Sequence, residues 1–201
     1  MPRIEREATV STGAEIGEGT IVWGLAQIRE GAVLGEDCVI GRGAYVGAGV
    51  RLGNRVKVQN LAQLYEPAVV EDGVFVGPGA VLTNDEYPRA IRPDGSLIDA
   101  AQWLAVGVTL RRGCSVGAGA VCVAPLEVGR WAMVAAGAVV VHDVPDFALV
   151  AGSPARRIGW VGPAGRRLVE EADGRWLCPV TGTLFAESGG LLHEGGDHDR
   201  A

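Results

Sequence analysis

The sequence predicts an all-β solenoid, in which short parallel strands wind around one axis, and three observations favour this fold class. An aliphatic residue recurs every six positions across residues 8–85 without a change of register. Glycine accounts for 31 of 201 residues, about twice its average share, which indicates regularly spaced turns. Neither the 3.6-residue period of a helix nor the simple alternation of an ordinary strand fits this pattern.

The repeat begins at Ala8 and comprises thirteen hexads, and six more follow after a break, starting at Val108. The aliphatic third places before the break are Val10, Ile16, Val22, Ile28, Leu34, Ile40, Val46, Leu52, Val58, Leu64, Val70, Val76 and Leu82. After the break, Leu110, Val116, Cys122, Val128, Val134 and Val140 take these places. Three hexads would close a triangular coil, so residues 18 apart should stack, in about six coils spaced ~4.8 Å apart. Burial of each third-place side chain contributes roughly 1.5–3 kcal/mol, so a polar residue at Leu52 or Val58 should be severely destabilising.

A long loop interrupts the repeat between Leu82 and Leu110, which are 28 positions apart where six are expected. We expect an inserted loop over about 84–105, and long excursions from a regular scaffold are usually functional. The solenoid domain, with this loop, should span residues 1–160. The remaining residues, 161–201, should form a tail with a short helix in 163–173, a hairpin in 174–192 and a disordered end.

Stacking at 18-residue intervals predicts a candidate site at the base of the loop. The polar or aromatic corner residues expected to crowd there in adjacent coils are Gln59, Asn60, Tyr65, Thr83, Asn84 and Asp85. The alternative is that these residues are simply solvated corners.

Composition excludes several classes of function. A net charge of −6 and a pI near 5.1 disfavour nucleic acid and anionic membranes as partners. We find no secretory signal and no 18-residue apolar span, so we expect a cytoplasmic location. Four cysteines without a CxxC pair indicate reduced thiols. The three histidines, His142, His193 and His198, lie outside the central coils, so neither a histidine base nor a metal site is expected.

Three stretches carry a specific family resemblance: TIVWG, GNRVKVQNLAQLYEPAVVEDGVFVGPGAVLTNDEYPRA and GAVVVHDVPDFALVAGSPARRIGW. They resemble the hexapeptide-repeat N-acetyltransferases that acylate nucleotide-linked 3-amino sugars, and the resemblance covers roughly residues 8–192. It implies a left-handed parallel β-helix and a homotrimer with its sites between subunits. It also implies acetyl-CoA as co-substrate, a UDP- or dTDP-linked amino sugar as acceptor, including 2-acetamido-3-amino-glucuronic acid, and no metal.

The resemblance also assigns roles to residues. Asn84 would orient the acceptor amine beside the thioester. The acceptor would be bound by Gln59, Asn60, Tyr65, Thr83, Asp85, Tyr87 and Arg89. Acetyl-CoA would be bound by Gly117, Ala118, Ala135, Ala136, Pro154, Arg156 and Arg157. Many relatives have a histidine where this chain has Gly24, which puts the acceptor contact there in question.

Two other functions stay open at this point. O-acetylation of a small sugar or amino acid would need a general base that the central coils do not supply. A catalytically silent β-helix that serves as a scaffold subunit would need no site at all.

Overall fold

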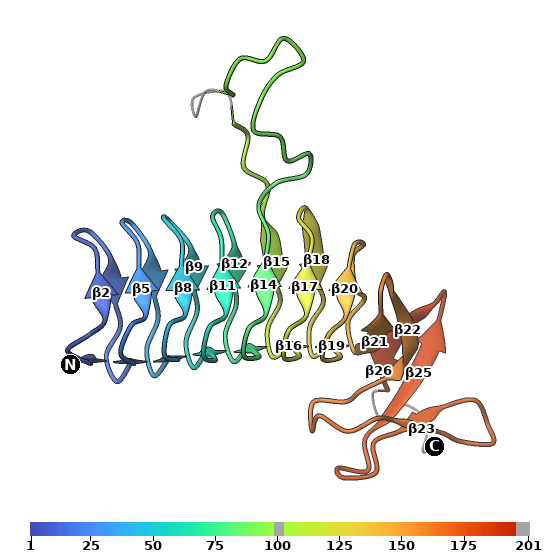
Figure 1. Cartoon of the computed structure of the whole chain (residues 1–201). Coiled ribbons are helices and arrows are strands. Elements are labelled where there is room, and N and C mark those ends of the chain that lie inside the picture. Colours follow the sequence, from blue (N-terminus) through green and yellow to red (C-terminus); the bar gives the residue numbers. More distant parts are fainter. Residues whose placement is uncertain (99–102, 196–201) are drawn as a thin grey trace.

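The computed structural model describes residues 1–98 and 103–195, and it shows a straight triangular prism with one projecting loop and a small terminal sheet (Figure 1). Among the described residues every regular element is a β-strand, and none is a helix long and apolar enough to cross a bilayer. The fold is the parallel β-solenoid that the hexad repeat predicted, and it is the left-handed β-helix that the family resemblance implied.

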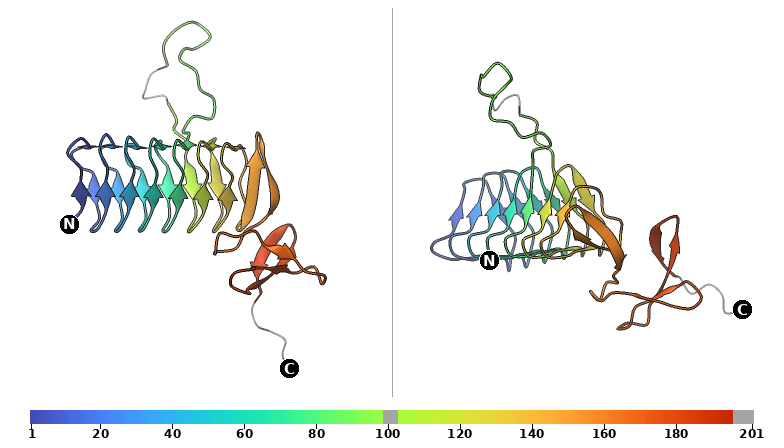
Figure 2. Two further views of the ribbon diagram at one scale, coloured as in Figure 1. Left: turned by 60° about the horizontal axis from the view of Figure 1, so that its bottom comes forward. Right: turned by 45° about the vertical axis from the view of Figure 1, so that its right-hand side comes forward.

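Three parallel sheets form the walls of the prism, and the chain visits them in the order A, B, C in every coil (Figure 2). Wall A contains β1 (Arg3–Ile4), β4 (Ile21–Val22), β7 (Val39–Ile40), β10 (Lys57–Val58), β13 (Phe75–Val76), β16 (Ser115–Val116), β19 (Met133–Val134) and β21 (Ala148–Gly152), with β22 (Ala155–Trp160) antiparallel at its edge. Wall B contains β2 (Thr9–Val10), β5 (Gln27–Ile28), β8 (Tyr45–Val46), β11 (Gln63–Leu64), β14 (Val81–Leu82), β17 (Val121–Cys122) and β20 (Val139–Val140). Wall C contains β3 (Glu15–Ile16), β6 (Val33–Leu34), β9 (Arg51–Leu52), β12 (Val69–Val70), β15 (Val108–Leu110) and β18 (Leu126–Val128).

The 18-residue stacking register holds along the prism. Lys57 pairs with Val39 on one side and with Phe75 on the other. Phe75 then pairs with Ser115, 40 positions on, which is one coil plus the inserted residues. The stack is slightly longer than the predicted six coils, because β1 precedes the first hexad and β21 continues wall A beyond the last one.

The core is a column of inward side chains from all three walls. Val58 is fully buried and Leu52 is 4% exposed, as the repeat predicted for third places. Most first places are small or β-branched, such as Ala26 and Ala62, and these two are fully buried. Each coil therefore buries the same kinds of side chain against its neighbours, and the prism has one continuous core.

A recurring hydrogen bond, which we call the corner clasp, ties successive coils together. At the corner between walls A and B, Asn60 Oδ1 accepts a hydrogen bond from the Arg42 backbone N–H at 2.9 Å. The Asn60 backbone N and this oxygen lie only 2.5 Å and 2.7 Å from the point where a Cβ on Gly41 would stand, so glycine is required there. The same clasp joins Asn54 to Glu36 N beside Gly35, Asp72 to Asn54 N beside Gly53, and Asp146 to Arg130 N beside Gly129. A corner amide that would otherwise lack a protein acceptor is thus satisfied by the next coil.

The C-terminal tail departs from the prediction in one respect. Residues 163–173 were expected to include a helix, but they hold a turn and strand β23 (Val169–Glu170). Gly165 has φ of +68°, and Val161 forms an antiparallel bridge with Arg167, so the chain reverses direction there. Strands β24 (Trp176–Leu177), β25 (Leu184–Ser188) and β26 (Leu191–Glu194) complete a four-stranded antiparallel sheet, where the sequence suggested a hairpin. The end predicted to be disordered, residues 194–201, is ordered at its start, because Glu194 pairs with Phe185 in β26 and the Gly195 N–H donates to the Leu184 carbonyl at 2.9 Å. Its remainder, residues 196–201, lies outside the described residues.

Candidate functional site

The inserted loop projects from the corner between walls B and C (Figure 1). A hollow of about 490 Å³ lies at its base. The chain leaves wall B after Leu82 and returns to wall C at Val108. The lining residues are Tyr65, Thr83, Asn84, Asp85, Glu86, Pro88 and Val123. Four of the residues predicted from the sequence therefore meet in one cavity.

Thr83 and Asn84 differ in what their side chains do. Thr83 Oγ1 accepts a hydrogen bond from the Ala124 backbone N–H at 2.9 Å, so this hydroxyl supports the coil. The Asn84 backbone carbonyl accepts from the Val106 N–H at 3.1 Å and closes the base of the loop. The half-buried Asn84 side chain, however, has no hydrogen-bond partner among the described residues. Its amide is free to bind a ligand in the cavity.

Tyr65 extends the site toward the N-terminal coils. Its ring lies 5.3 Å from that of Tyr45, centroid to centroid, at a tilt of 46°. The Tyr45 hydroxyl accepts a hydrogen bond from Arg29 Nη1 at 3.3 Å, and Arg29 also pairs with Glu30 at 2.9 Å. Tyr45 was not predicted as a site residue. The sequence did contain an indication of this contact: Tyr45 precedes Tyr65 by 20 residues, which is one 18-residue coil plus two positions, so the two rings lie in adjacent coils.

Two carboxylates give the cavity a negative character. Asp85 accepts a hydrogen bond from the indole N–H of Trp103, which joins the two legs of the loop. Glu86 lines the cavity beside it and, through a hydrogen bond, raises the pKa of Tyr87. Since no lysine or arginine lines the cavity, its charge favours a cationic ligand. Glu86 and Pro88 were missed from the sequence because loop residues carry no repeat. Val123 was missed although the repeat places it one coil after Thr83, since β14 pairs with β17.

Two predicted loop residues are not part of this cavity. Tyr87 is 83% exposed, and Arg89 is exposed and donates from Nη1 to the Pro88 carbonyl at 3.0 Å. Neither lines the hollow at the base of the loop.

The expectation that Gln59 and Asn60 crowd against Tyr65 and Asn84 is wrong within one chain. Gln59 and Asn60 follow β10 and occupy the corner between walls A and B, whereas Tyr65 and Asn84 follow β11 and β14 at the corner between walls B and C. Residues 18 apart share a corner, but a residue six further along the chain lies on the next one. In addition, Asn60 Oδ1 is already engaged in a corner clasp.

The residues predicted to bind acetyl-CoA line the same corner as Gln59, nearer to the C-terminal end. Gly117 and Ala118 follow β16, and Ala135 and Ala136 follow β19 one coil further on. A Cβ on Gly117 would lie 2.4 Å from the Ala136 N, so close stacking itself requires this glycine. Ala118 and Ala136 are exposed and carry only methyl groups. This leaves a smooth ridge along which a narrow chain could lie against the backbone.

The ridge leads to the β21–β22 turn, where Pro154, Arg156 and Arg157 were predicted to bind the cofactor. Arg156 is exposed and donates to its neighbour's carbonyl, Ala155 O, at 2.9 Å. Arg157 is held between the Trp160 ring and Glu187. The residues present therefore fit an extended thioester cofactor with an anionic end, because the ridge is free of large side chains and ends beside two arginines.

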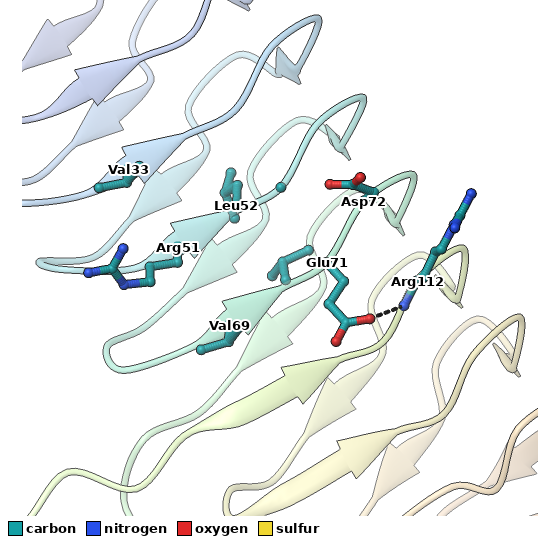
Figure 3. Close-up of a pocket in the computed structure, with 9 residues that line it drawn as sticks. Val33, Arg51, Leu52, Val69, Glu71, Asp72 and Arg112 are labelled. Atoms are coloured by element: carbon teal, nitrogen blue, oxygen red, sulfur yellow. Dashed lines mark hydrogen bonds between the residues drawn. The ribbon is translucent and has the colours of Figure 1, made fainter.

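A second hollow, of about 450 Å³, lies on the outer face of wall C (Figure 3). Val33 and Val69 form its floor, Arg51 lies at its side, and Glu71 accepts from the Arg112 backbone N–H at 2.8 Å. None of the predicted site residues lines it. Across the described residues, no group of three or more His, Cys, Asp or Glu side chains is arranged as metal ligands.

Comparisons with known proteins agree with this architecture. The family model described as "Bacterial transferase hexapeptide (six repeats)" matches residues 13–48, so the chain carries this repeat. The dTDP-3-amino-3,6-dideoxy-alpha-D-galactopyranose 3-N-acetyltransferase of Aneurinibacillus thermoaerophilus is 50% identical over 52 residues, which are 26% of this chain and 27% of the relative. Serine acetyltransferase of Haemophilus influenzae is 45% identical over 47 residues, 23% of this chain and 18% of the relative.

A solved structure shows the same fold. LpxA, a UDP-N-acetylglucosamine acyltransferase from Bacteroides fragilis, superimposes with a TM-score of 0.64 at 15% identity, over 79% of this chain and 61% of that chain. At this identity the match shows the fold alone. The aligned part covers less than two thirds of each of these three relatives.

Proposed function

We propose that this hexapeptide-repeat chain is an acetyl-CoA-dependent N-acetyltransferase whose acceptor is the amino group of a nucleotide-linked 3-amino sugar. The observation that carries the proposal is the Asn84 side chain, a corner amide that the fold leaves unused inside a negatively charged cavity. The similarity to a dTDP-3-amino-sugar N-acetyltransferase supports the class of acceptor. The residues of the resembling family's TND motif fall at this cavity.

Asn84 would act by orienting the amine. Its amide oxygen accepts a hydrogen bond from an amine N–H, which directs the nitrogen lone pair toward the thioester carbonyl. The nitrogen then forms a bond to the carbonyl carbon, the carbon–sulfur bond breaks, and the departing thiolate takes up the proton lost from nitrogen. Asp85 and Glu86 would attract the acceptor in its ammonium form, which must release one proton to solvent before the neutral nitrogen attacks, and the ring of Tyr65 offers a face for the sugar.

Acetyl-CoA would lie along the ridge between Gly117 and Ala136, with its phosphates toward Arg156 and Arg157. This ridge and the Asn84 cavity lie on the two different corners that flank wall B of one chain. A neighbouring copy that places its ridge against the cavity would complete the site. This arrangement would also bring Gln59 and Asn60 of one copy, which share the ridge's corner, toward Tyr65 and Asn84 of the other, and it supports a trimer with its sites between subunits.

O-acetylation is the second candidate because of the similarity to serine acetyltransferase. A hydroxyl needs a strong general base, and the residues that line the cavity include no histidine but two carboxylates, which are ordinarily weaker bases than an imidazole. An amine needs less help because its neutral form is already a competent nucleophile. The cavity therefore favours the amine.

The test is release of free thiol from acetyl-CoA in the presence of UDP- and dTDP-linked 3-amino sugars, with the matching 3-hydroxy sugars alongside. We expect turnover with an amino sugar only. Asn84→Ala should lower kcat by about 10²-fold without loss of thermal stability, since misplacing the nucleophile alone costs that much. Asn54→Ala is the matched control: it removes a corner asparagine that clasps Glu36, so stability should fall while kcat is kept. Full activity in Asn84→Ala would remove Asn84 from its role, and turnover of the 3-hydroxy sugars alone would favour O-acetylation.

A further inference from the structure

The C-terminal sheet packs on the end of the solenoid, where Phe185 lies against Phe147, and it also places one carboxylate at the predicted cofactor end. Glu187, on β25, accepts a hydrogen bond from Arg157 Nη1 at 2.9 Å with Oε1 and from the Trp160 indole N–H at 2.9 Å with Oε2. Arg157 and Trp160 both belong to β22, 30 and 27 positions earlier in the chain. One side chain of the tail thus binds two side chains at the edge of wall A.

Arg157 is also fixed by an aromatic ring. Its guanidinium carbon lies 4.1 Å from the centroid of the fully buried Trp160 ring. A planar guanidinium stacked on a ring and paired at one nitrogen has few orientations left. The Arg157 side chain is still 39% exposed, and its Nε and Nη2 have no hydrogen-bond partner among residues 1–98 and 103–195.

The electrostatics of this cluster favour a stable ion pair between the Glu187 carboxylate and the Arg157 guanidinium. The Trp160 indole N–H, with a further contribution from Arg157, holds the pKa of Glu187 below its ordinary value. Glu187 is therefore ionised at neutral pH and stays paired with Arg157. The free edge of the guanidinium keeps its donors for a second anion, because a guanidinium presents five N–H groups.

We propose that Glu187 is a positioning residue for the cofactor: it holds Arg157 against Trp160 so that the free edge of the guanidinium meets the 3′-phosphate of coenzyme A. This inference rests on the proposed function for the identity of the cofactor. It gives the C-terminal sheet a role, since the sheet supplies the carboxylate that orients an anion-binding arginine of the solenoid. Without Glu187, Arg157 would have to be ordered on binding, and ordering one long side chain weakens binding by about two- to tenfold.

The experiment is calorimetric binding of coenzyme A and of 3′-dephospho-coenzyme A to the full chain, which does not depend on turnover. The wild type should bind coenzyme A more tightly than the dephospho form. Glu187→Ala should weaken coenzyme A binding about two- to tenfold and leave the dephospho form unchanged. Arg157→Gln should remove the preference for the phosphate altogether. Glu170→Ala, on exposed β23 of the same sheet, is the control and should bind both ligands as the wild type does.

Other outcomes separate the possibilities. If Glu187→Ala unfolds the tail, Glu187→Gln keeps the shape and can still accept from the indole, and it should show the same selective loss. Three results in Glu187→Ala and Glu187→Gln would overturn the inference: equal weakening for both ligands, tighter binding of coenzyme A, or no change in affinity. The two proposals can fail separately. If the protein acetylates no amine but its preference for the 3′-phosphate depends on Glu187, the proposed function is refuted and the role of Glu187 stands. If the protein transfers acetyl groups but shows no preference for the 3′-phosphate, the proposed function stands and the role of Glu187 is refuted.

Discussion

Thr20 offers a direct test of how the coils are held together, because it is fully buried and polar. Its hydroxyl donates to the Gly35 carbonyl at 2.8 Å and accepts from the Cys38 N–H at 2.9 Å. In other coils these two backbone groups bond to each other directly, as Ala44 N does to Gly41 O at 3.2 Å. The Thr20 hydroxyl is therefore inserted into a turn of the next coil.

Thr20→Val keeps the shape of the side chain and removes both hydrogen bonds. Each is worth about 1 kcal/mol net, and a buried amide left without an acceptor costs about 1–3 kcal/mol. The added methyl group offsets about 0.8 kcal/mol of this loss. We expect the free energy of unfolding to fall by about 1–3 kcal/mol, and Tm to fall on the order of 5 °C.

Thermal unfolding followed by circular dichroism, at one fixed protein concentration, measures this change. Thr20→Ser is the matched control, since it keeps the hydroxyl and loses only a methyl group, so the order of stability should be Thr, Ser, Val. Hydrogen exchange at the Cys38 amide should quicken in Thr20→Val alone. A valine variant as stable as the serine variant would show that the turn closes directly, as it does at Ala44, and would refute this reasoning.

Two further predictions concern the coil that follows the inserted loop. Arg111 forms ion pairs with Glu71 at 2.8 Å and with Glu127 at 2.5 Å, and all three side chains are partly exposed. Arg111→Met should therefore lower the free energy of unfolding by about 0.2–1 kcal/mol per pair, and by less in high salt. Arg111 lowers the pKa of Glu71, so this stabilisation is fully present above the ordinary glutamate pKa of 4.5 and is lost as the pH falls below it. Urea unfolding at several pH values should therefore show a smaller stability difference between wild type and variant in acid. Burial raises the pKa of the Cys122 thiol to about 12 and that of Cys114 further, so an alkylating reagent at pH 8 should label neither thiol before unfolding, and rapid native labelling of either would contradict the buried core.

The walls of the prism were predictable because every coil repeats one local rule. A third-place aliphatic residue must face inward in each hexad, so counting in sixes placed Val58 and Leu52 in the core correctly. The insertion was also predictable, since the register resumes after it without a shift. The contacts of the tail were not predictable. Glu187 meets Arg157 and Trp160 across a sheet that has no period, and nothing in the local sequence marks that pairing.

The candidate site was only half predictable, for a geometric reason. Counting by 18 places Tyr65 and Thr83 in one column, and both line the cavity. Counting by six moves to the next corner, which is why Asn60 belongs to the ridge side of wall B rather than to the cavity. Counting along one chain therefore places these residues on two corners, and only the proposed assembly with a neighbouring copy would bring them together.

The corner clasp explains which corner asparagine is free, and it can be read from the sequence. Except in the short last coil, each clasping residue follows a glycine by 19 residues: Gly35 precedes Asn54 and Gly41 precedes Asn60 in this way. A Cβ on either glycine would meet both the clasping oxygen and the backbone of the next coil. Where Glu66 follows Gly47, the longer side chain fills the same space, but Glu66 Oε2 has no hydrogen-bond partner in the described part of the chain. Nineteen residues before Asn84 stands Tyr65, not glycine. Asn84 forms no clasp with a described residue, so its amide is left to the cavity, and this is why we propose Asn84 rather than Asn60 as the residue that would meet the acceptor.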